Sequence, residues 1–295
     1  MGSTALTKHM SSLRKNQPVA GALYILGAGF MFAIMGALVR MVSTSLNNEM
    51  VVFFRNLFAL IFMIPVLVTR RALPELKTEN FSSHLIRTVT GLSAMYCYFY
   101  ALAHMKLAEA VLLSYTTPLF IPLIALIWLK EPVPKMVRFA VIIGFAGVVL
   151  ILRPGFGIFQ PVSVIALIAA IFASTAMVTI RSMSDSEPPG RIVFYYTVLS
   201  TLISAIPLLW AWEMPQGSIL PLLLLMGIVA VSGQLLMTRG YSAAPAAQVG
   251  PFIYATVVFA SILGWIFWSE ALDLLSLTGA ILICIAGVTA TRRTQ

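Results

Sequence analysis

The sequence contains few charged residues, and this shortage excludes most classes of soluble protein. Only 10% of the 295 residues are Asp, Glu, Lys or Arg, whereas 60% are hydrophobic. A typical soluble domain carries about 25% charged residues. We therefore predict an integral membrane protein in contact with the lipid bilayer. The formal charge of +9 does not indicate a nucleic-acid partner, because the basic residues are scattered between apolar runs and form no basic face.

Side chains that hold metals or nucleotides are also scarce. The two cysteines, Cys97 and Cys284, lie within apolar runs and show no metal-ligand spacing, so no metal site and no cofactor is predicted. The chain contains no P-loop signature, which excludes ATP-driven pumping. An intramembrane enzyme would need reactive side chains gathered at one depth, and His9, His84 and His104 all fall outside the predicted membrane core. No catalytic residues are expected, and a membrane-embedded enzyme or a scaffold is the alternative from another class.

Acidic residues are missing from the middle of the apolar runs. A proton or sodium relay normally needs an Asp or Glu at mid-membrane depth. Their absence favours uncoupled, facilitated movement of a substrate down its gradient. It also argues against efflux of quaternary-ammonium drugs, which a buried carboxylate would bind.

Ten apolar stretches are present, and each is long enough to cross a membrane as a helix. A bilayer core about 30 Å thick requires about 20 apolar residues in a helical span. The stretches are residues 19–42, 50–69, 84–104, 108–129, 136–153, 162–181, 191–212, 218–238, 246–268 and 273–291. They predict an all-α integral membrane protein with ten transmembrane helices and no soluble domain.

Basic residues predict the orientation of these helices, since positively charged loops stay in the cytoplasm. With the N-terminus inside, the inner segments hold 15 of the 19 Lys and Arg residues. These are Lys8, Arg14, Lys15, Arg70, Arg71, Lys77, Arg87, Lys130, Lys135, Arg138, Arg181, Arg191, Arg239, Arg292 and Arg293. We therefore expect cytoplasmic tails at residues 1–18 and 292–295, and both termini in the cytoplasm.

The chain repeats itself, and the stretch 108–148 shows this most clearly. A similar stretch begins about 140 residues later, which indicates a duplicated unit. The matched pairs are Tyr115 with Tyr254, Glu131 with Glu270, Arg40 with Arg181, Pro65 with Pro207, and Gly147 with Gly287. Each unit holds five predicted helices, and five is odd, so the second unit must enter the membrane with the opposite polarity. Residues 19–153 and 162–291 are therefore predicted to be two inverted-topology repeats.

Two motifs in the second repeat resemble those of a known family. The sequence Pro-Ala-Ala-Gln-Val-Gly-Pro occupies 245–251, and Gly-Ala-x-Leu-Ile-x-x-x-Gly-Val at 279–288 follows Glu270. With the five-plus-five duplication, they make the chain similar to EamA-type transporters of the drug/metabolite transporter superfamily. The resemblance implies a multi-pass protein of the bacterial inner membrane, in which spans 1–4 and 6–9 surround a central cavity and spans 5 and 10 are peripheral.

The same resemblance implies export of a small molecule by alternating access. Size and aromatic content are similar to those of bacterial aromatic amino acid exporters, so amino acids, including aromatic ones, are the expected substrates. Other members of the family are associated with other metabolites or toxic cations, so proton-coupled efflux of other metabolites or drugs is the alternative. The protein is expected to be a monomer or a homodimer.

Arg55 is the leading candidate for a substrate-binding residue. It lies about 9 Å into the second predicted span at 1.5 Å per residue, where it would dock a carboxylate. Alternatively, it forms a structural pair with Glu49 or Glu109. Arg87 is the other basic residue within reach of the membrane, and two arginines poorly support a polyphosphorylated substrate.

Further substrate-binding candidates lie on several predicted spans. Ser93, Tyr96 and Tyr100 share one helical face of the third span, and tyrosine rings suit an aromatic substrate. Interfacial anchoring or packing would explain the same pattern. Gln234 in the eighth span and Tyr254 in the ninth are expected across the cavity.

The fourth span is expected to bend at its prolines. Pro118 and Pro122 lack the amide hydrogens that would bond to the carbonyls of Ser114 and Pro118, so Ser114 and Thr117 are candidates to contact substrate. Alternatively, the threonine hydroxyls satisfy these carbonyls. The expected gating residues are Glu109, Pro118, Pro122, Gln248 and Pro251. Glu109 matches Gln248 in the other repeat, so the two gates would differ.

Overall fold

The computed structural model describes residues 18–69, 77–128, 130, 135–152, 161–183, 186, 187, 189–243, 250–271 and 273–291. These residues form helices and no strand. The first half contains α2 (Pro18–Val42), α3 (Asn48–Thr69), α4 (Phe81–His104), α5 (Leu107–Ser114), α6 (Thr117–Trp128) and α7 (Lys135–Leu152). The second half contains α8 (Pro161–Met183), α9 (Pro189–Ala205), α10 (Leu208–Ala211), α11 (Leu220–Ala243), the 3-10 helix η2 (Gly250–Tyr254), α13 (Ala255–Trp268) and α14 (Leu274–Thr291).

Long apolar helices confirm the predicted all-helical membrane fold. Five segments are long and apolar enough to cross a bilayer: Val19–Val42, Asn48–Pro65, Leu107–Trp128, Pro161–Ile180 and Leu220–Met237. Shorter apolar helices cover Val141–Leu150, Phe252–Trp268 and Leu274–Ala286. The total of ten crossings and the orientation of the termini stay predictions.

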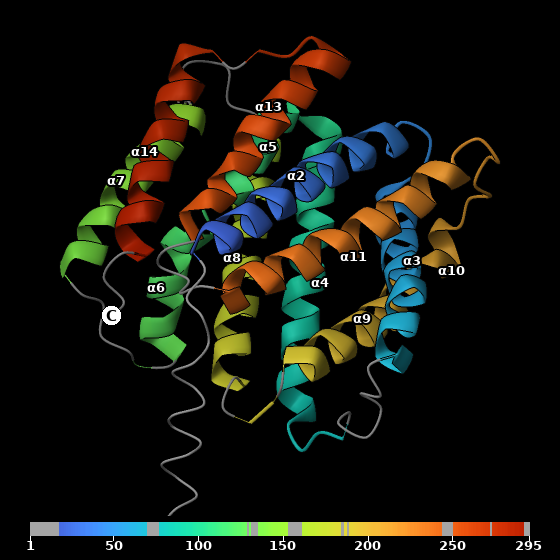
Figure 1. The fold of residues 1–295 in the computed structure, drawn as a ribbon. Coiled ribbons are helices and arrows are strands. Elements are labelled where there is room, and N and C mark those ends of the chain that lie inside the picture. The colour runs from blue at the N-terminus through green and yellow to red at the C-terminus, as the bar shows by residue number, and fades with distance from the viewer. Residues whose placement is uncertain are drawn as a thin grey trace, which may run out of the picture.

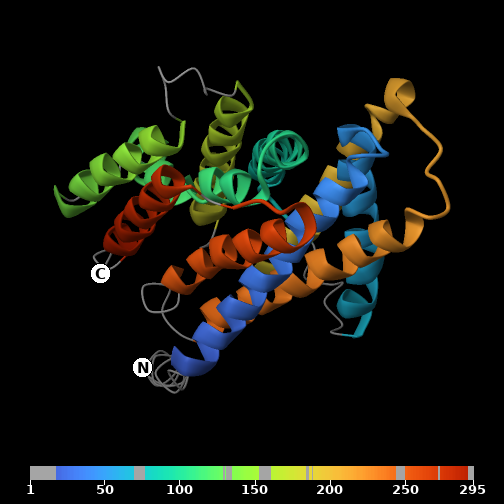
Figure 2. The same ribbon diagram turned by 90° about the horizontal axis from the view of Figure 1, so that it is seen from above.

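Helix pairing follows the duplication. The first helix of each repeat packs against the third helix of the other, so α2 contacts α11 and α8 contacts α4 (Figure 1). Likewise, α2 contacts α13, and α8 contacts α5 and α6. The last helices of the repeats, α7 and α14, pack against each other and lie side by side at one edge of the molecule in both views (Figures 1 and 2). The two repeats are thus interlocked.

Three of the predicted spans are not continuous α-helices. The fourth breaks between α5 and α6 at Tyr115, and the ninth begins as η2 and becomes α-helical after Tyr254. The breaks therefore fall at the matched tyrosines of the two repeats, close to Pro118 and Pro251. The predicted span 191–212 divides into α9 and α10 at Pro207. Proline has no amide hydrogen to continue an α-helix, which explains why each break lies near one.

The α7–α14 contact depends on a glycine. A Cβ atom at Gly147 would lie 2.7 Å from the carbonyl oxygen of Gly279, which is backbone and cannot rotate away. We expect Gly147→Leu to lower the free energy of unfolding by about 1–3 kcal/mol, as overpacking does. The apparent melting temperature of the purified protein checks this. Gly190→Ala is the control, because no atom lies within 4 Å of a Cβ there, and equal melting temperatures for both variants would contradict the close contact.

The two ends of the bundle differ. The end of the bundle at which α2 begins and α14 ends is called the terminal end. The end at which α2 ends is called the opposite end. At the opposite end, Arg40 forms an ion pair with Glu270, with an Nη2–Oε1 distance of 2.6 Å and a hydrogen bond from Nη1 to Oε2 of 2.8 Å. The amide of Leu107 also donates to Glu270 Oε2 at 3.0 Å. These contacts join α2, the start of α5 and the residues that follow α13 at this end.

Candidate functional site

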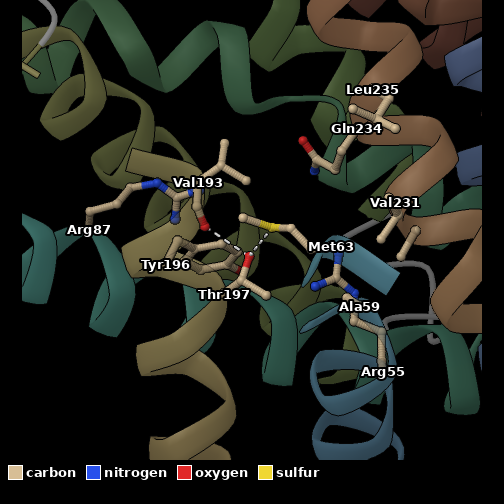
Figure 3. Close-up of a pocket in the computed structure, with 11 residues that line it drawn as sticks. Arg55, Ala59, Met63, Arg87, Val193, Tyr196, Thr197, Val231, Gln234 and Leu235 are labelled. Carbon is tan, nitrogen blue, oxygen red and sulfur yellow. Dashed lines mark hydrogen bonds between the residues drawn. The ribbon is translucent and has the colours of Figure 1, made fainter. Parts of the chain in front are cut away.

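Three adjoining pockets lie between the repeats, and Tyr196 and Gln234 line all three. The arginine pocket, about 100 Å³, is lined by Arg55 and Arg87 (Figure 3). The aromatic pocket, about 260 Å³, includes Arg55 and the aromatic side chains Phe32, Tyr98, Phe99 and Tyr115. The terminal pocket, about 360 Å³, includes Arg87 and Glu187. Typical small-molecule sites have volumes of roughly 300–1,000 Å³. The volume of the terminal pocket alone falls in this range, so the three pockets together have room for a metabolite.

Arg55 extends from α3 into the arginine and aromatic pockets. Its side chain is buried, with 9% of the residue exposed. Nη1 donates to Oδ1 of Asn56 at 3.0 Å, and the Asn56 amide reaches Ser204 of α9 at 3.5 Å. Glu109, one of its proposed structural partners, lies at the opposite end, 3.8 Å from Lys106 Nζ and within hydrogen-bonding distance of Ser276.

Arg87 lies on α4 and stacks on an aromatic ring. Its guanidinium carbon is 4.0 Å from the ring centroid of Tyr196 on α9, which is a cation–π contact. A Cβ atom at Gly91 would overlap Arg87 Nη1 and lie 3.0 Å from the Tyr196 ring. The glycine one turn along α4 therefore leaves the space in which the guanidinium stacks.

Neither arginine forms an ion pair with a carboxylate in the described part of the chain, and the Nε atom of each is buried without a hydrogen-bond partner. Arginine stays protonated in proteins, so both groups keep their charge. Burying a charge without a counter-charge costs several kcal/mol. The site is therefore electrostatically suited to an anion.

Glu187 is the acidic residue of the terminal pocket, and it is already paired. Its carboxylate accepts hydrogen bonds from Thr78 and from Arg191 Nη1, the latter at 2.8 Å, and lies 3.5 Å from His84 Nε2. Burial raises the pKa of Glu187, but the hydrogen bonds from Thr78 and Arg191 and the nearby charges outweigh this effect and hold the pKa below its ordinary value. The carboxylate thus stays ionised at neutral pH and binds the segment before α4 to the start of α9.

This pairing predicts a pH-dependent stability. Glu187→Gln should lower the free energy of unfolding by about 1–3 kcal/mol at neutral pH, the cost of losing hydrogen bonds to a charged group. The folded pKa lies below the ordinary 4.5, so the contribution is fully present above pH 4.5 and is lost as the pH falls through the folded value. The melting temperatures of the variant and the wild type should differ at neutral pH and become equal as the pH is lowered. Glu79→Gln, which alters an exposed carboxylate nearby, is the control, and a difference that grows on acidification would contradict the assignment.

The structure brings some predicted site residues together. Arg55, Ser114 and Gln234 line the aromatic pocket. Tyr254 is buried with its ring centroid 6.3 Å from that of Tyr115, so the matched tyrosines of the two repeats face each other. Thr117 lies beside Ser114, and its hydroxyl donates to the Ser114 carbonyl at 2.7 Å. The carbonyl that Pro118 leaves free is thus bound by the helix itself.

Ser93, Tyr96 and Tyr100 do not line any of the three pockets. Tyr100 is exposed and stacks on His104, with ring centroids 4.1 Å apart. The face of α4 that lines the pockets carries Arg87, Gly91, Ala94 and Tyr98 instead. The sequence pattern places Arg87 among the basic residues of the cytoplasmic side, and it predicts Tyr96 and Tyr100 as the substrate-binding residues of this span. A glycine one turn after an arginine within a span was the signal that could have identified this face.

The predicted gating residues lie at different places. Glu109 begins α5 at the opposite end, and Pro122 lies within α6. Pro118 is the second residue of α6, and Pro251 is the second residue of η2. Gln248 lies outside the described residues.

Two interlocked helical repeats surround the three pockets, and the ion pair of Arg40 with Glu270 joins helices at the opposite end. This arrangement defines a membrane transporter, in which a central site between repeats is exposed to one side at a time. The model of the EamA-like transporter family matches residues 19–153 and 160–291. The chain belongs to this family.

Named relatives agree with this class. The chain is 34% identical to the pseudopaline exporter CntI of Pseudomonas aeruginosa over 276 residues, covering 92% of this chain and 96% of that one. It is 28% identical to a riboflavin transporter of Vibrio cholerae, covering 85% and 86%. It is 27% identical to human solute carrier family 35 member G1, covering 94% and 80%. A solved crystal structure with 19% identity has the same fold, with a TM-score of 0.65 over 92% of this chain and 96% of that one.

Proposed function

We propose that the protein exports small metabolites, most of all amino acids and including aromatic ones, by alternating access across a bacterial inner membrane. The observation that carries the proposal is the buried, carboxylate-free Arg55 in a pocket lined by aromatic side chains. Arg55 would bind the substrate carboxylate, and the rings of Tyr98, Phe99 and Tyr115 would contact its apolar part.

In this proposal, the direction of transport, from the cytoplasm outward, depends on which end of the bundle gives access to the pockets. The positive-inside rule assigns the terminal end to the cytoplasm. The terminal pocket, with Glu187 at the start of α9, lies toward that end, and the Arg40–Glu270 pair joins helices at the other. In this proposal the pair holds the far end closed, and a cytoplasmic substrate would reach Arg55 from the terminal end. An exporter loads in such a state.

Coupling to protons is not part of the proposal. Glu187 is the acidic residue among the lining of the three pockets, and its pKa lies below its ordinary value. A carboxylate with a lowered pKa stays ionised at physiological pH in this conformation, which does not favour a role in carrying protons. Proton-coupled efflux of other metabolites is the second candidate. Relatives named as a pseudopaline exporter and a riboflavin transporter support its substrate class, other metabolites, and not the coupling.

The test is transport by the purified protein in liposomes. A panel of aromatic and aliphatic amino acids is assayed with and without a pH gradient, and saturable movement of at least one amino acid is expected without the gradient. Movement of riboflavin but of no amino acid would overturn the substrate class. Strict dependence on the gradient would support the proton-coupled alternative.

A further inference from the structure

Two positive charges from different helices enter one pocket. Arg55 comes from α3 and Arg87 from α4, and both line the arginine pocket together with Tyr196 and Gln234 (Figure 3). Their positions along the helices differ. Arg55 is seven residues from the α3 start at the opposite end, about 10 Å, and Arg87 is six residues from the α4 start at the terminal end, about 9 Å. The two side chains thus reach the pocket from opposite depths.

No carboxylate in the described part of the chain forms an ion pair with either arginine. Among the described residues, the carboxylate that shares a pocket with Arg87 is Glu187, and it is held by Arg191 and Thr78. Arg55 donates to the neutral side chain of Asn56, and Arg87 stacks on the ring of Tyr196. Two like charges in a low-dielectric cavity repel each other, and each also bears its own burial cost. A bound molecule with one negative charge would neutralise only one of the two arginines and leave the other without a counter-charge.

We propose that the preferred substrate carries two separate carboxylates, one bound by Arg55 and one by Arg87, on an aromatic or otherwise apolar body. This inference rests on the proposed function and specifies its substrate class. Two separated carboxylates fit better than one phosphate, because the arginines approach from different depths. The apolar body would lie in the aromatic pocket, which adjoins Arg55. Arginine binds carboxylates through two parallel hydrogen bonds, so both groups would be recognised by geometry as well as charge.

Direct binding to the purified full-length protein in nanodiscs tests this. The probes are phenylsuccinate, with two carboxylates, 3-phenylpropionate, with one, the monoamide of phenylsuccinate, and phenyl phosphate. We expect phenylsuccinate to bind at least about tenfold more tightly than the other three, since it alone offers a separate carboxylate to each arginine. Arg55→Gln and Arg87→Gln should each abolish this preference.

If a glutamine variant fails to fold, lysine variants at the same positions still test the inference. Arg55→Lys and Arg87→Lys retain the charge but lose the two-pronged geometry, so they should weaken phenylsuccinate binding and retain a reduced preference. Equal binding of phenylsuccinate and 3-phenylpropionate, tighter binding of phenyl phosphate, or no binding of phenylsuccinate would each overturn the inference.

The transport assay separates this inference from the proposed function. If monocarboxylate amino acids move through the liposome-embedded protein while phenylsuccinate shows no binding preference, the inference fails and the proposed function stands. If phenylsuccinate binds with the expected preference but no compound moves, the two-arginine site stands and the proposed function fails.

Discussion

Replacing Arg40 by Glu is expected to reduce transport at least tenfold, because it breaks the ion pair that, in the proposed mechanism, holds the opposite end closed. Arg40 and Glu270 are joined by two contacts of 2.6 and 2.8 Å, and their side chains are only 18% and 15% exposed. Hydrogen bonds between charged groups contribute about 1.5–3 kcal/mol each, enough to shift an open–closed equilibrium by one to two orders of magnitude. Initial transport rates in liposomes measure the effect.

The reversed pair is the critical control for this prediction. Arg40→Glu combined with Glu270→Arg restores the charge pair, although the Leu107 amide loses its acceptor, so partial recovery is expected. Lys106→Ala breaks a 3.8 Å pair with Glu109 at the same end, in which the lysine side chain is 44% exposed. Exposed pairs contribute about 0–1 kcal/mol, so this variant should transport almost normally. A double variant no better than Arg40→Glu alone would show that the pair does not act as a gate.

The duplication predicts a matching pair at the terminal end. Arg181 corresponds to Arg40 and Glu131 to Glu270, but Glu131 and the side chain of Arg181 lie outside what the structure describes. We expect these two to pair when the terminal end closes, by the symmetry of inverted repeats. Arg181→Glu should therefore slow transport, and Arg181→Glu with Glu131→Arg should restore it in part. Normal transport by the single variant would exclude such a pair.

Replacing Gly91 by Ala is expected to weaken substrate binding by about tenfold without unfolding the protein. The added Cβ would overlap the end of the flexible Arg87 side chain, which can move aside, but the guanidinium would leave the Tyr196 ring. A desolvated cation–π contact contributes about 2 kcal/mol, and the moved charge would no longer meet the substrate. A rise in the transport KM with an unchanged melting temperature is the expected result.

Gly27→Ala is the matched control for this substitution. A Cβ at Gly27, on α2, would meet only Leu236 Cδ1 at 3.4 Å, which is ordinary van der Waals contact. This variant should bind and transport like the wild type. A Gly91→Ala protein that transports with an unchanged KM would show that the position of Arg87 is unimportant.

The fold could be predicted from the sequence because it depends on regular, local patterns. The apolar runs predicted the helices, and the duplication predicted that the two halves are alike. The contacts of α2 with α11 and of α8 with α4 show this likeness, since each pairs a first helix with the third helix of the other repeat. Arg55 could be singled out because a charge within an apolar run is costly wherever the helix packs. The prolines likewise marked the break after Ser114, since a missing amide hydrogen acts locally.

Which residues of a helix face the pockets depends on how the helix is rotated about its axis, and this is why the sequence did not identify some of the site residues. Tyr96 and Tyr98 lie two positions apart on α4, and of these two only Tyr98 lines one of the three pockets. The hydrophobic pattern of α4 does not distinguish the face toward the cavity from the face toward other helices. Glu270 was recognised as a marker of the repeat, but its pairing with Arg40 joins residues that are 230 positions apart. Contacts at that separation are set by tertiary packing, which no local pattern encodes.

In the proposed mechanism, the substrate passes through the three pockets between the repeats. An Ala94→Cys variant tests this most directly, because Ala94 lines both the aromatic and the terminal pockets. Cys97 and Cys284 are replaced by Ser, a membrane-impermeant thiol reagent is applied to each side, and transport of L-phenylalanine and phenylsuccinate is followed. Ser93→Cys, on a face of α4 that lines no described pocket, is the control. The account predicts that labelling at position 94 blocks transport and that the transported compound protects this cysteine but not the one at position 93. Normal transport by the fully labelled Ala94→Cys protein would contradict it.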